Sequence, residues 1–539
     1  MYIYQTYRDI RLVGTPPESV GKFGGDTDNW EWPRHTGDFS VFRVYADKGG
    51  KPAPFSKENI PFKPKHHLPV SIKGIKDGDF AMIFGYPGST NRYETSYGIR
   101  LKNDIENPSL VALRDMRLKY MHEQMIKDPA VKLKLASSYA GIANYWKFFD
   151  GETKQLIKFN TLGTKQDYEN KFSTWAKGKP EYENLMAEYE KNYAAWTPYA
   201  KGRQYLNEGI MGSPLAAFAA SLIGLEAALV KTGISAADIK KAADAANAQR
   251  TAFLEGEDKP SDEKILAAVA QAFYNDIDKS QQPIGTYEKI KAAYGDLKGD
   301  ATYKKWAADV FANTIIFNDS KWNSFIANPD ANVLQADPAF DFAASFVKNY
   351  NSKYAPLRSA FVNKNNELGR SYMKGIMQMN PAAVNKMYPD ANFSMRVSYG
   401  NVKSYKPRDA VFYDYVTTSK GVLEKYKPGD YEYDLPEKQI ELFKKKDFGQ
   451  YIDKAKNDLV IGFITSNDIT GGNSGSPVIN GNGHLIGLAF DGNYEALSHK
   501  IAFDKDLNRT INVDIRYVLW CIDKLGGAKN IIDELTLVK

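Results

Sequence analysis

The sequence predicts a multi-domain protein in which one β-domain is interrupted by a large inserted helical domain. Its 539 residues exceed the size at which a single hydrophobic core stops growing, so at least two domains are expected. Short strand-like runs bounded by Gly and Asp occupy both ends of the chain, whereas Lys, Glu, Ala and Leu at helical spacing occupy the middle. The predicted segments are residues 1–94 (β), 95–392 (α) and 393–539 (β with a C-terminal helix).

Each segment rests on its own pattern of apolar residues. The first contains two strand candidates, at 39–45 and 80–84, each next to a Gly or Asp turn signal. In the second, apolar residues recur every three or four positions, and the Ala-rich stretch at 236–252 is typical of a helix. The third segment returns to strands and then ends as a helix. Its strands are expected at 395–399, 458–465 and 484–490.

The composition is that of an ordinary globular protein and excludes several classes. Hydrophobic residues make up 43% and charged residues 25%, and the net charge of +6 is too small on this length to indicate a nucleic-acid or membrane partner. Cys521 is the single cysteine, so no intrachain disulfide or cysteine-based metal site is expected, and no cofactor is implied. The longest apolar stretch, at 216–230, contains Glu226 and is too short to span a bilayer.

The strongest chemical signal is the run Gly-Gly-Asn-Ser-Gly-Ser-Pro at residues 471–477. A nucleophilic serine must sit on a tight turn with its hydroxyl exposed, and glycines permit both the turn and the close approach of backbone N–H groups to an oxyanion. The pattern predicts Ser474 as the nucleophile, with the N–H groups of Gly472 and Ser474 as the oxyanion hole. Taken alone, the same residues could form an ordinary turn of any β-protein.

The motif resembles the Gly-Asp/Asn-Ser-Gly-Gly/Ser-Pro signature of chymotrypsin-clan serine peptidases. The resemblance implies a chymotrypsin-like fold of two β-barrels and a catalytic triad in the chain order His, Asp, Ser. Asp38 follows Gly37 and opens the predicted strand at 39–45, so it is the expected triad aspartate that orients the imidazole. The alternative is that Asp38 is only a turn residue.

Longer blocks of sequence resemble the bacterial dipeptidyl-peptidase 7 and 11 family, and the resemblance runs along essentially the whole chain. These blocks lie at residues 23–38, 485–497 and 509–519. The resemblance implies that the helical insertion caps the active-site cleft and that dipeptides are cut from the free N-termini of oligopeptides. It implies that the substrate ammonium group is bound by Asn29, Trp30, Asn144 and Asp491.

These residue types suit the recognition of an ammonium group. Asp491 supplies negative charge, the amides of Asn29 and Asn144 supply carbonyl acceptors, and Trp30 supplies an aromatic surface. Each of them alone has an ordinary structural explanation, such as a turn at Asp491. Their joint occurrence within the family blocks favours the functional interpretation.

Gly492 lies 18 residues after Ser474, where the family selects the side chain next to the scissile bond. The type 11 members, which prefer acidic residues, have arginine at this position. Glycine leaves the pocket open and uncharged, as in the type 7 members. The resemblance therefore predicts a hydrophobic second residue in the substrate, because an acidic side chain would be desolvated without a cationic partner.

The catalytic histidine of the family is expected far before the aspartate, yet only 37 residues precede Asp38. His35 is the one histidine in that stretch, and it belongs to the block at 23–38, where the family has a noncatalytic histidine. We therefore expect the first barrel to be incomplete, the catalytic histidine to be missing, and the chain to be truncated and inactive as given.

The resemblance also implies partners and a location. Family members are exported to the periplasm and form homodimers, although no signal peptide opens this chain. Two other functions fit parts of the pattern: a non-catalytic peptide-binding protein on the same fold, and a chymotrypsin-like endopeptidase. An endopeptidase has no use for the ammonium-binding residues, so blocking the N-terminus of the substrate distinguishes it from a dipeptidyl peptidase.

Overall fold

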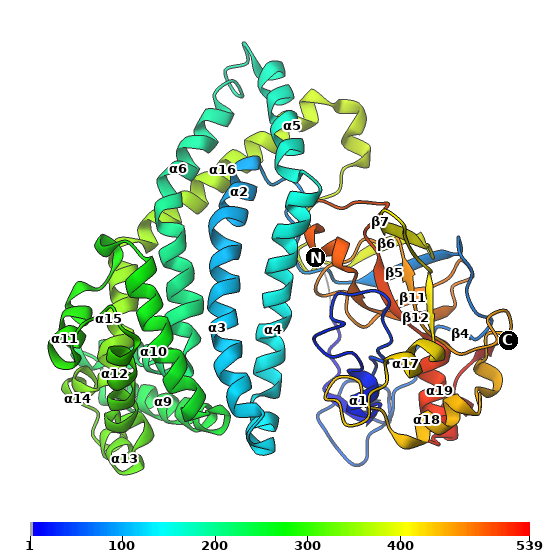
Figure 1. The fold of residues 1–539 in the computed structure, drawn as a ribbon, viewed down its shortest axis with the longest axis horizontal. Helices are drawn as coiled ribbons and strands as arrows, with labels where there is room; N and C mark the ends of the chain where they lie inside the picture. The colour runs from blue at the N-terminus through cyan, green and yellow to red at the C-terminus, as the bar shows by residue number, and fades with distance from the viewer. Residues whose placement is uncertain (1–3) are drawn as a thin grey trace. The chain divides into compact units, whose positions relative to one another are not determined.

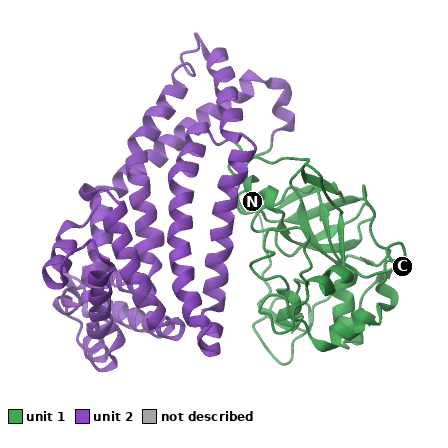
Figure 2. Ribbon diagram, in the orientation of Figure 1, with its two compact units in different colours: residues 1–92, 388–539 green, residues 93–387 purple. Residues whose placement is uncertain are grey.

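The computed structural model describes residues 4–539 and divides the chain into two compact units (Figure 2). One unit combines residues 1–92 with 388–539, and the other consists of residues 93–387. The boundaries predicted from the sequence lie at residues 94 and 392. The first predicted segment also includes residues 1–3, which lie outside the described residues. The protein is therefore multi-domain, with one helical unit inserted into a unit that contains the sheets.

The unit of residues 93–387 is built from helices (Figure 1). Its helices are α2 (Ser96–Leu101), α3 (Asn107–Met125), α4 (Pro129–Lys158), α5 (Thr161–Ala176), α6 (Leu185–Gln204), α7 (Pro214–Ser221), α8 (Ile223–Val230), α9 (Ala236–Gly256), α10 (Lys259–Asp276), α11 (Ile284–Tyr294), α12 (Asp300–Asn313), α13 (Asp319–Ala327), α14 (Ala331–Ala336), α15 (Pro338–Lys353) and α16 (Ala355–Met379). The Ala-rich stretch predicted as a helix is α9.

Capping residues explain where several of these helices begin. The Asp128 carboxylate accepts a hydrogen bond from Ala130 N at the start of α4, and Ser235 Oγ accepts one from Asp238 N at the start of α9. Asp337 caps α15 by accepting from two backbone N–H groups. Apolar side chains at helical spacing then face inward, as Leu113 and Met121 of α3 do.

The helical unit holds a buried carboxyl pair, Glu257 and Asp262, around the start of α10. Leu215 N donates a 2.7 Å hydrogen bond to Asp262, which helps to keep that carboxylate ionised. Burial, and then the negative charge of Asp262, raise the pKa of Glu257 well above its usual range. Glu257 is therefore the member of the pair that holds a proton in the folded protein.

We expect Glu257→Gln to stabilise the helical unit at alkaline pH. Above the pKa of an unfolded glutamate, about 4.3, folding requires proton uptake at Glu257, so stability falls as the pH rises towards the folded pKa. Glutamine mimics the protonated form and removes this penalty, which should raise the free energy of unfolding at pH 8 by about 1–3 kcal/mol. Thermal melts at pH 4 and pH 8 test this: the gain should shrink at pH 4. The exposed Glu255 provides the control Glu255→Gln, and equal gains at both pH values would contradict the assignment.

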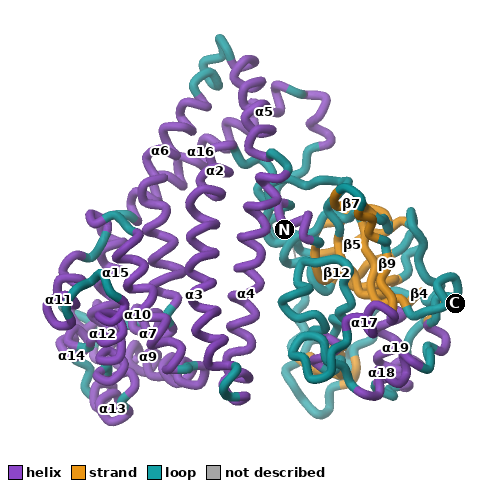
Figure 3. The backbone as a smooth tube through the Cα atoms, in the orientation of Figure 1, coloured by secondary structure: helices purple, strands orange, loops and turns teal. Residues whose placement is uncertain are grey.

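The second unit contains the sheets, drawn in orange in Figure 3. Within residues 4–539, three strands form a small sheet in the order β1-β2-β3. Nine strands form a larger sheet whose main path is β6-β5-β11-β12-β13-β10-β9, with β4 paired to β12 and β14 paired to β4. The strands are β1 (Asp9–Gly14), β2 (Val41–Ala46), β3 (Ile60–Pro61), β4 (Val70–Ser71), β5 (Phe80–Gly85), β6 (Arg396–Asn401), β9 (Val416–Thr418), β10 (Val460–Thr465), β11 (Ser476–Ile479), β12 (Leu485–Gly492), β13 (Thr510–Asp514) and β14 (Leu537–Val538).

The large sheet joins segments from both ends of the chain. Strand β5, before the helical insertion, pairs antiparallel with both β6 and β11 from after it. Strands β10 and β13 are buried along their whole length. In β10 this burial is mainly apolar, whereas in β13 the apolar Ile511 and Val513 alternate with buried polar residues. An isolated bridge between Val402 and Thr465 connects the end of β6 to the end of β10.

The C-terminal region differs from the predicted terminal helix. Residues Ile515–Trp520 form α19 and Lys529–Asp533 form α20, but the last described element is the strand β14. Leu537 of β14 pairs in parallel with Val70 of β4, a partner more than 450 residues away that local periodicity does not indicate.

Among the described residues, no individual helix combines the length and apolarity needed to cross a membrane, although the bent pair Leu185–Gly212 and Pro214–Val230 meets both criteria jointly.

Candidate active site

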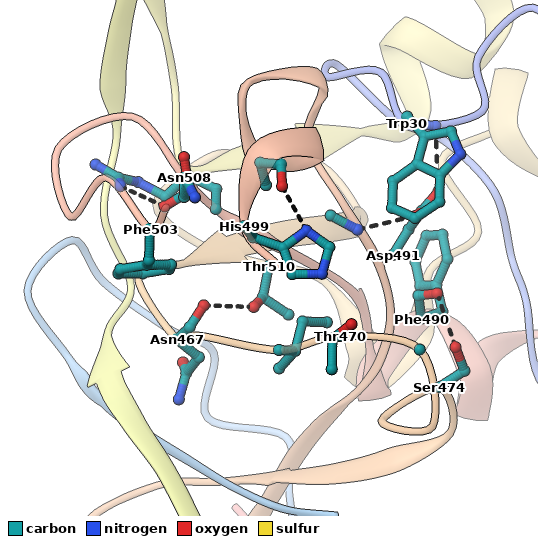
Figure 4. Close-up of a pocket in the computed structure, with 15 residues that line it drawn as sticks. Trp30, Asn467, Thr470, Ser474, Phe490, Asp491, His499, Phe503, Asn508 and Thr510 are labelled. Atoms are coloured by element: carbon teal, nitrogen blue, oxygen red, sulfur yellow. Dashed lines mark hydrogen bonds between the residues drawn. The ribbon is translucent and has the colours of Figure 1, made fainter. Parts of the chain in front are cut away.

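Ser474 lies on the loop between β10 and β11, where the glycines of the motif shape a tight turn. Gly472 and Gly475 have φ values of +104° and +81°, in the left-handed region that favours glycine. The buried side chain of Asn473 braces the turn by accepting a hydrogen bond from Thr470 N at 3.2 Å. The Ser474 side chain is exposed, and its Oγ lies 3.4 Å from the carbonyl oxygen of Phe490 (Figure 4).

Some backbone N–H groups of this turn donate hydrogen bonds within the fold, and others do not. Those of Asn473, Gly475 and Ser476 donate hydrogen bonds to carbonyl oxygens of the fold, at 2.7–3.0 Å. Within residues 4–539, no backbone carbonyl oxygen accepts a hydrogen bond from the N–H group of Gly472 or of Ser474. Two N–H groups flanking an exposed hydroxyl are what an oxyanion hole requires.

Gly472→Ala is expected to distort this turn and lower peptidase activity. A Cβ at Gly472 would lie 2.3 Å from the carbonyl oxygen of Tyr86, and the positive φ would add a backbone cost of about 1–2 kcal/mol. Displacing one oxyanion donor should reduce kcat about 10²-fold. Gly471→Ala is the matched control, because nothing lies within 4 Å of its Cβ and its φ is not positive. Equal kcat values in the two variants would contradict this role.

The turn borders a cavity whose wall is held together by Asp491, at the end of β12. Lining residues include Trp30, Ser474, Asp491 and Gly492. Asp491 Oδ2 accepts a hydrogen bond from Trp30 N at 3.2 Å (Figure 4). Oδ2 also accepts from Arg34 Nη1 at 2.9 Å, and Oδ1 accepts from Gly492 N at 2.9 Å. The carboxylate thus holds the loop that carries Trp30 against the strand beside the nucleophile.

Arg34 favours the charged form of Asp491 and opposes the effect of burial. The two side chains are each 9% exposed, and the guanidinium also donates to the carbonyl oxygen of Asp28. Burial raises the pKa of Asp491, whereas the Arg34 charge and the backbone donors lower it. An ammonium group that approaches Asp491 would therefore meet a carboxylate already bound to one cation, with its aromatic neighbour Trp30 in place.

Asp38 lies on the loop that leads into β2, with an exposed side chain. The neighbouring chain partly desolvates its carboxyl group, which raises the pKa of Asp38. The positive charge of Arg34 lowers this pKa, and the negative charge of Asp491 raises it further. The three charged groups thus lie within electrostatic reach of one another. The roles of Asp38 and Ser474 in a triad stay predictions.

Two histidines lie near this region, and burial lowers the pKa of each to about 3. His35 is packed beside Gly421, and His499 lines the cavity, where its Nδ1 lies 2.5 Å from the carbonyl oxygen of Ala496 (Figure 4). Among the hydrogen bonds of residues 4–539, none joins a histidine to Ser474 Oγ. That the catalytic histidine is missing from this chain stays a prediction.

The remaining predicted residues divide between the two units. Asn29 is partly buried and directly precedes Trp30, whose φ is +61°. Gly492 lines the cavity, and a Cβ there would meet the Ala496 Cβ at 3.4 Å, an ordinary contact distance. Asn144 belongs to α4 of the helical unit, so its part in binding stays a prediction.

Similarity to known proteins shows the family of this chain. The model of the peptidase S46 family matches residues 1–537. The chain belongs to the peptidase S46 family. It is 43% identical to "Dipeptidyl-peptidase 7" of Capnocytophaga gingivalis and 39% identical to "Asp/Glu-specific dipeptidyl-peptidase" of Flavobacterium psychrophilum. Both alignments cover 100% of this chain and 74% of the relative. Porphyromonas endodontalis DPP11 with the dipeptide Arg-Glu matches with a TM-score of 0.88 at 33% identity, over 99% of this chain and 75% of that one.

These comparisons overturn the predicted hydrophobic second residue. Four relatives are named Asp/Glu-specific dipeptidyl-peptidase, and two matched DPP11 structures hold Arg-Glu and Arg-Asp. The physical reason is that the prediction considered one position, Gly492, whereas Asn467, Thr470 and Asn508 add polar groups to the cavity walls. The predicted truncation and inactivity find no support in these comparisons either, in which 100% of this chain aligns with dipeptidyl-peptidases over 74% of their length.

Sequence reasoning missed two residues of this S46 site. Arg34, the partner of Asp491, lies within the block at 23–38, and a basic residue inside an otherwise aromatic and acidic block was the available signal. Phe490, whose carbonyl contacts Ser474 Oγ, carries no such signal. It is one apolar residue of a strand, and only the pairing of β12 with β11 brings it there.

Proposed function

We propose that this S46 peptidase removes dipeptides from the free N-termini of oligopeptides, with Ser474 as the nucleophile. The observation that carries the proposal is the exposed Ser474 hydroxyl at the mouth of a cavity whose wall is formed by Asp491 and Trp30. A carboxylate so near a nucleophile suits a substrate whose ammonium group must lie close to the bond that is cut.

The proposed chemistry follows the serine acyl-transfer pattern. Ser474 Oγ attacks the carbonyl carbon of the second substrate residue, and the N–H groups of Gly472 and Ser474 bind the oxyanion that forms. The base that Asp38 orients takes the proton of Ser474 and gives it to the departing amine, a role assigned to none of the histidines within residues 4–539. Water then hydrolyses the acyl-enzyme and releases the dipeptide.

Recognition of the N-terminus limits the product to two residues in this proposal. Asp491 attracts the substrate ammonium group, Trp30 offers an aromatic surface beside it, and Asn29 and Asn144 supply carbonyl acceptors. The hydrogen bonds from Arg34 and Trp30 to Asp491 support this role, because they fix the carboxylate in one position.

The fold proposed for the sheet-containing unit is a chymotrypsin-like pair of β-barrels. The bridge between Val402 and Thr465 supports closure of the larger sheet, because it joins β6 to β10. In this proposal the three strands β1 to β3 belong to the other barrel. The exposure of Asp38 beside β2 agrees with a position facing such a cleft.

Dipeptide amides of a fluorophore test the proposed activity. The protein should release the fluorophore from a dipeptide amide with a free N-terminus and not from the same compound with an acetylated N-terminus, because acetylation removes the ammonium charge. Release from both compounds would instead indicate an endopeptidase, and release from neither would contradict the proposal.

Family resemblance further supports two proposals about the natural setting. Action on oligopeptides fits a periplasmic location, and we propose assembly as a homodimer. Light scattering of the purified chain should then give about twice the monomer mass of 60.5 kDa, and a monomer at micromolar concentration would contradict that assembly.

A further inference from the structure

The carboxylate of Glu432 binds the backbone of the loop that leads to Asn29 and Trp30. Its Oε1 accepts hydrogen bonds from the backbone N–H groups of Asp26 and Thr27, at 2.7 and 3.2 Å. Its Oε2 accepts one from Thr27 Oγ1 at 2.5 Å. The side chain is partly buried, and 405 positions separate Glu432 from Thr27, so only the tertiary fold brings them together. One carboxylate thus fixes two successive peptide groups just before the predicted ammonium-binding pair.

Two glycines let Glu432 approach this backbone closely. Gly24 N donates a 2.8 Å hydrogen bond to the carbonyl oxygen of Glu432, so the backbone of Glu432 binds the loop as well as its side chain. Gly25 has a φ of +48°, and a Cβ there would lie 2.3 Å from Glu432 Oε1. A side chain at residue 25 would therefore push the carboxylate away from the Asp26 N–H group.

Asp28, further along the loop, binds the same segment of residues 425–433 with the opposite polarity. Its carboxylate accepts hydrogen bonds from Lys425 Nζ at 2.6 Å and from the Tyr433 hydroxyl at 3.1 Å. Asp28 is buried, so these bonds are shielded from competing water. The segment therefore accepts hydrogen bonds from the loop through Glu432 and donates hydrogen bonds to it through Lys425 and Tyr433.

The segment around Glu432 is itself fixed by contacts within the same unit. Asp430 Oδ1 accepts hydrogen bonds from Glu432 N and Tyr433 N, at 2.9 and 3.1 Å. The Tyr433 ring packs edge-on against the buried ring of Phe23, with the ring centroids 5.6 Å apart. A carboxylate held in this way offers the loop a support of defined position.

Trp30 requires such support because its backbone conformation is unfavourable. Its φ is +61°, a region that a bulky residue adopts only where the surrounding structure enforces it. Asp491 binds Trp30 N at 3.2 Å (Figure 4), and Glu432 binds the loop three and four residues earlier. The loop is therefore held at two points, each by a carboxylate that accepts hydrogen bonds from its backbone.

We propose that Glu432 is a positioning residue for the substrate ammonium group and acts through the loop of residues 24–30. The inference rests on the proposed function, in which Asn29 and Trp30 bind that group. The hydrogen bonds of Glu432 go to the loop, whereas the turn of Ser474 is braced by its own bonds. Loss of Glu432 should therefore weaken binding of the free N-terminus in the ground state and the transition state alike, which raises KM and leaves kcat in place.

Glu432→Ala tests this role with a fluorogenic dipeptide amide that has a free N-terminus. KM should rise about tenfold while kcat changes by less than about threefold. Glu432→Gln keeps an oxygen that accepts from the Asp26 N–H group, so its KM should stay within about threefold of that of the unmodified protein. The exposed Glu424, which pairs with Lys420 on the same stretch of chain, provides the matched control Glu424→Ala, which should change neither constant.

Gly25→Ala tests the same contact from the side of the loop. Its Cβ displaces Glu432 Oε1, so KM should again rise while kcat is kept. Gly50→Ala is the matched control, because Gly50 also has a positive φ, +75°, but nothing lies within 4 Å of its Cβ. This second pair of variants decides the question if Glu432→Ala does not fold.

The outcomes separate this inference from the proposed function. An unchanged KM in Glu432→Ala, or in Gly25→Ala should the former not fold, overturns the inference. A parallel loss of kcat and of Ser474 labelling by a fluorophosphonate also overturns it, because Glu432 would then only stabilise the fold. If the unmodified protein cleaves no dipeptide amide, or cleaves the acetylated compound equally well, the proposed function itself fails and this inference fails with it.

Discussion

Ser474→Ala is expected to abolish dipeptide release while the protein stays folded. The Ser474 hydroxyl is the group proposed to form the acyl-enzyme, and removing a catalytic serine costs about 10⁴- to 10⁶-fold in kcat. The hydroxyl is exposed and contacts only a backbone carbonyl, at 3.4 Å, so its loss should leave the melting temperature within about 1 °C. Release of the fluorophore and covalent labelling by a fluorophosphonate, followed by intact mass, measure the effect.

Ser476→Ala is the matched control for this substitution. Ser476 lies two residues further along the same motif, but it begins β11 and is 8% exposed, with its Oγ turned toward Gly85. This variant should keep both the labelling and the activity. Residual activity of Ser474→Ala near that of the unmodified protein would remove Ser474 from the mechanism.

The second large effect is expected from Asp491→Asn. The substitution keeps the shape of the side chain but removes the charge that the substrate ammonium group requires, and it leaves Arg34 buried without its counter-ion. Losing the charge that binds the ammonium group should cost about 3–4 kcal/mol of interaction with the substrate, so kcat/KM for a free dipeptide amide should fall by about 10²- to 10³-fold. The measurement is the ratio of kcat/KM between free and acetylated substrates, which should approach unity.

Asp468→Asn separates recognition from stability. Asp468 forms a bidentate pair with Arg92 at 2.8–2.9 Å in the same unit, so its loss should also lower the melting temperature. Asp468 pairs with Arg92 and Asp491 pairs with Arg34, so this variant should keep the preference for a free N-terminus. A loss of that preference in both variants would show that Asp491 acts only by stabilising the fold.

Local patterns predicted much of this fold. The strands around 39–45, 80–84, 458–465 and 484–490 appear as β2, β5, β10 and β12, because alternation or burial of apolar residues is a property of neighbours in the sequence. The two-unit organisation followed from the change in composition. What local patterns did not predict was the C-terminal strand β14, whose partner β4 lies at the other end of the chain.

The candidate site shows the same division. The turn around Ser474 could be predicted because its glycines lie within five residues of sequence, and two of them, Gly472 and Gly475, have positive φ. The Arg34–Asp491 pair could not, since its members are 457 positions apart and only the folded sheet brings them within 2.9 Å. The prediction of a hydrophobic second substrate residue was wrong for a related reason. It rested on Gly492 alone, whereas Thr470, Asn467 and Asn508 also line the cavity.

The central claim is that binding of the substrate ammonium group sets the position of cleavage after the second residue. Digestion of a defined decapeptide, followed by mass spectrometry over time, tests this claim most directly. The proposed mechanism predicts that the free peptide loses successive dipeptides from its N-terminus, giving intermediates of eight, six and four residues, and that the acetylated peptide stays intact. Internal fragments, odd-numbered intermediates or equal cleavage of the acetylated peptide would contradict the proposed recognition by Asp491 and Trp30.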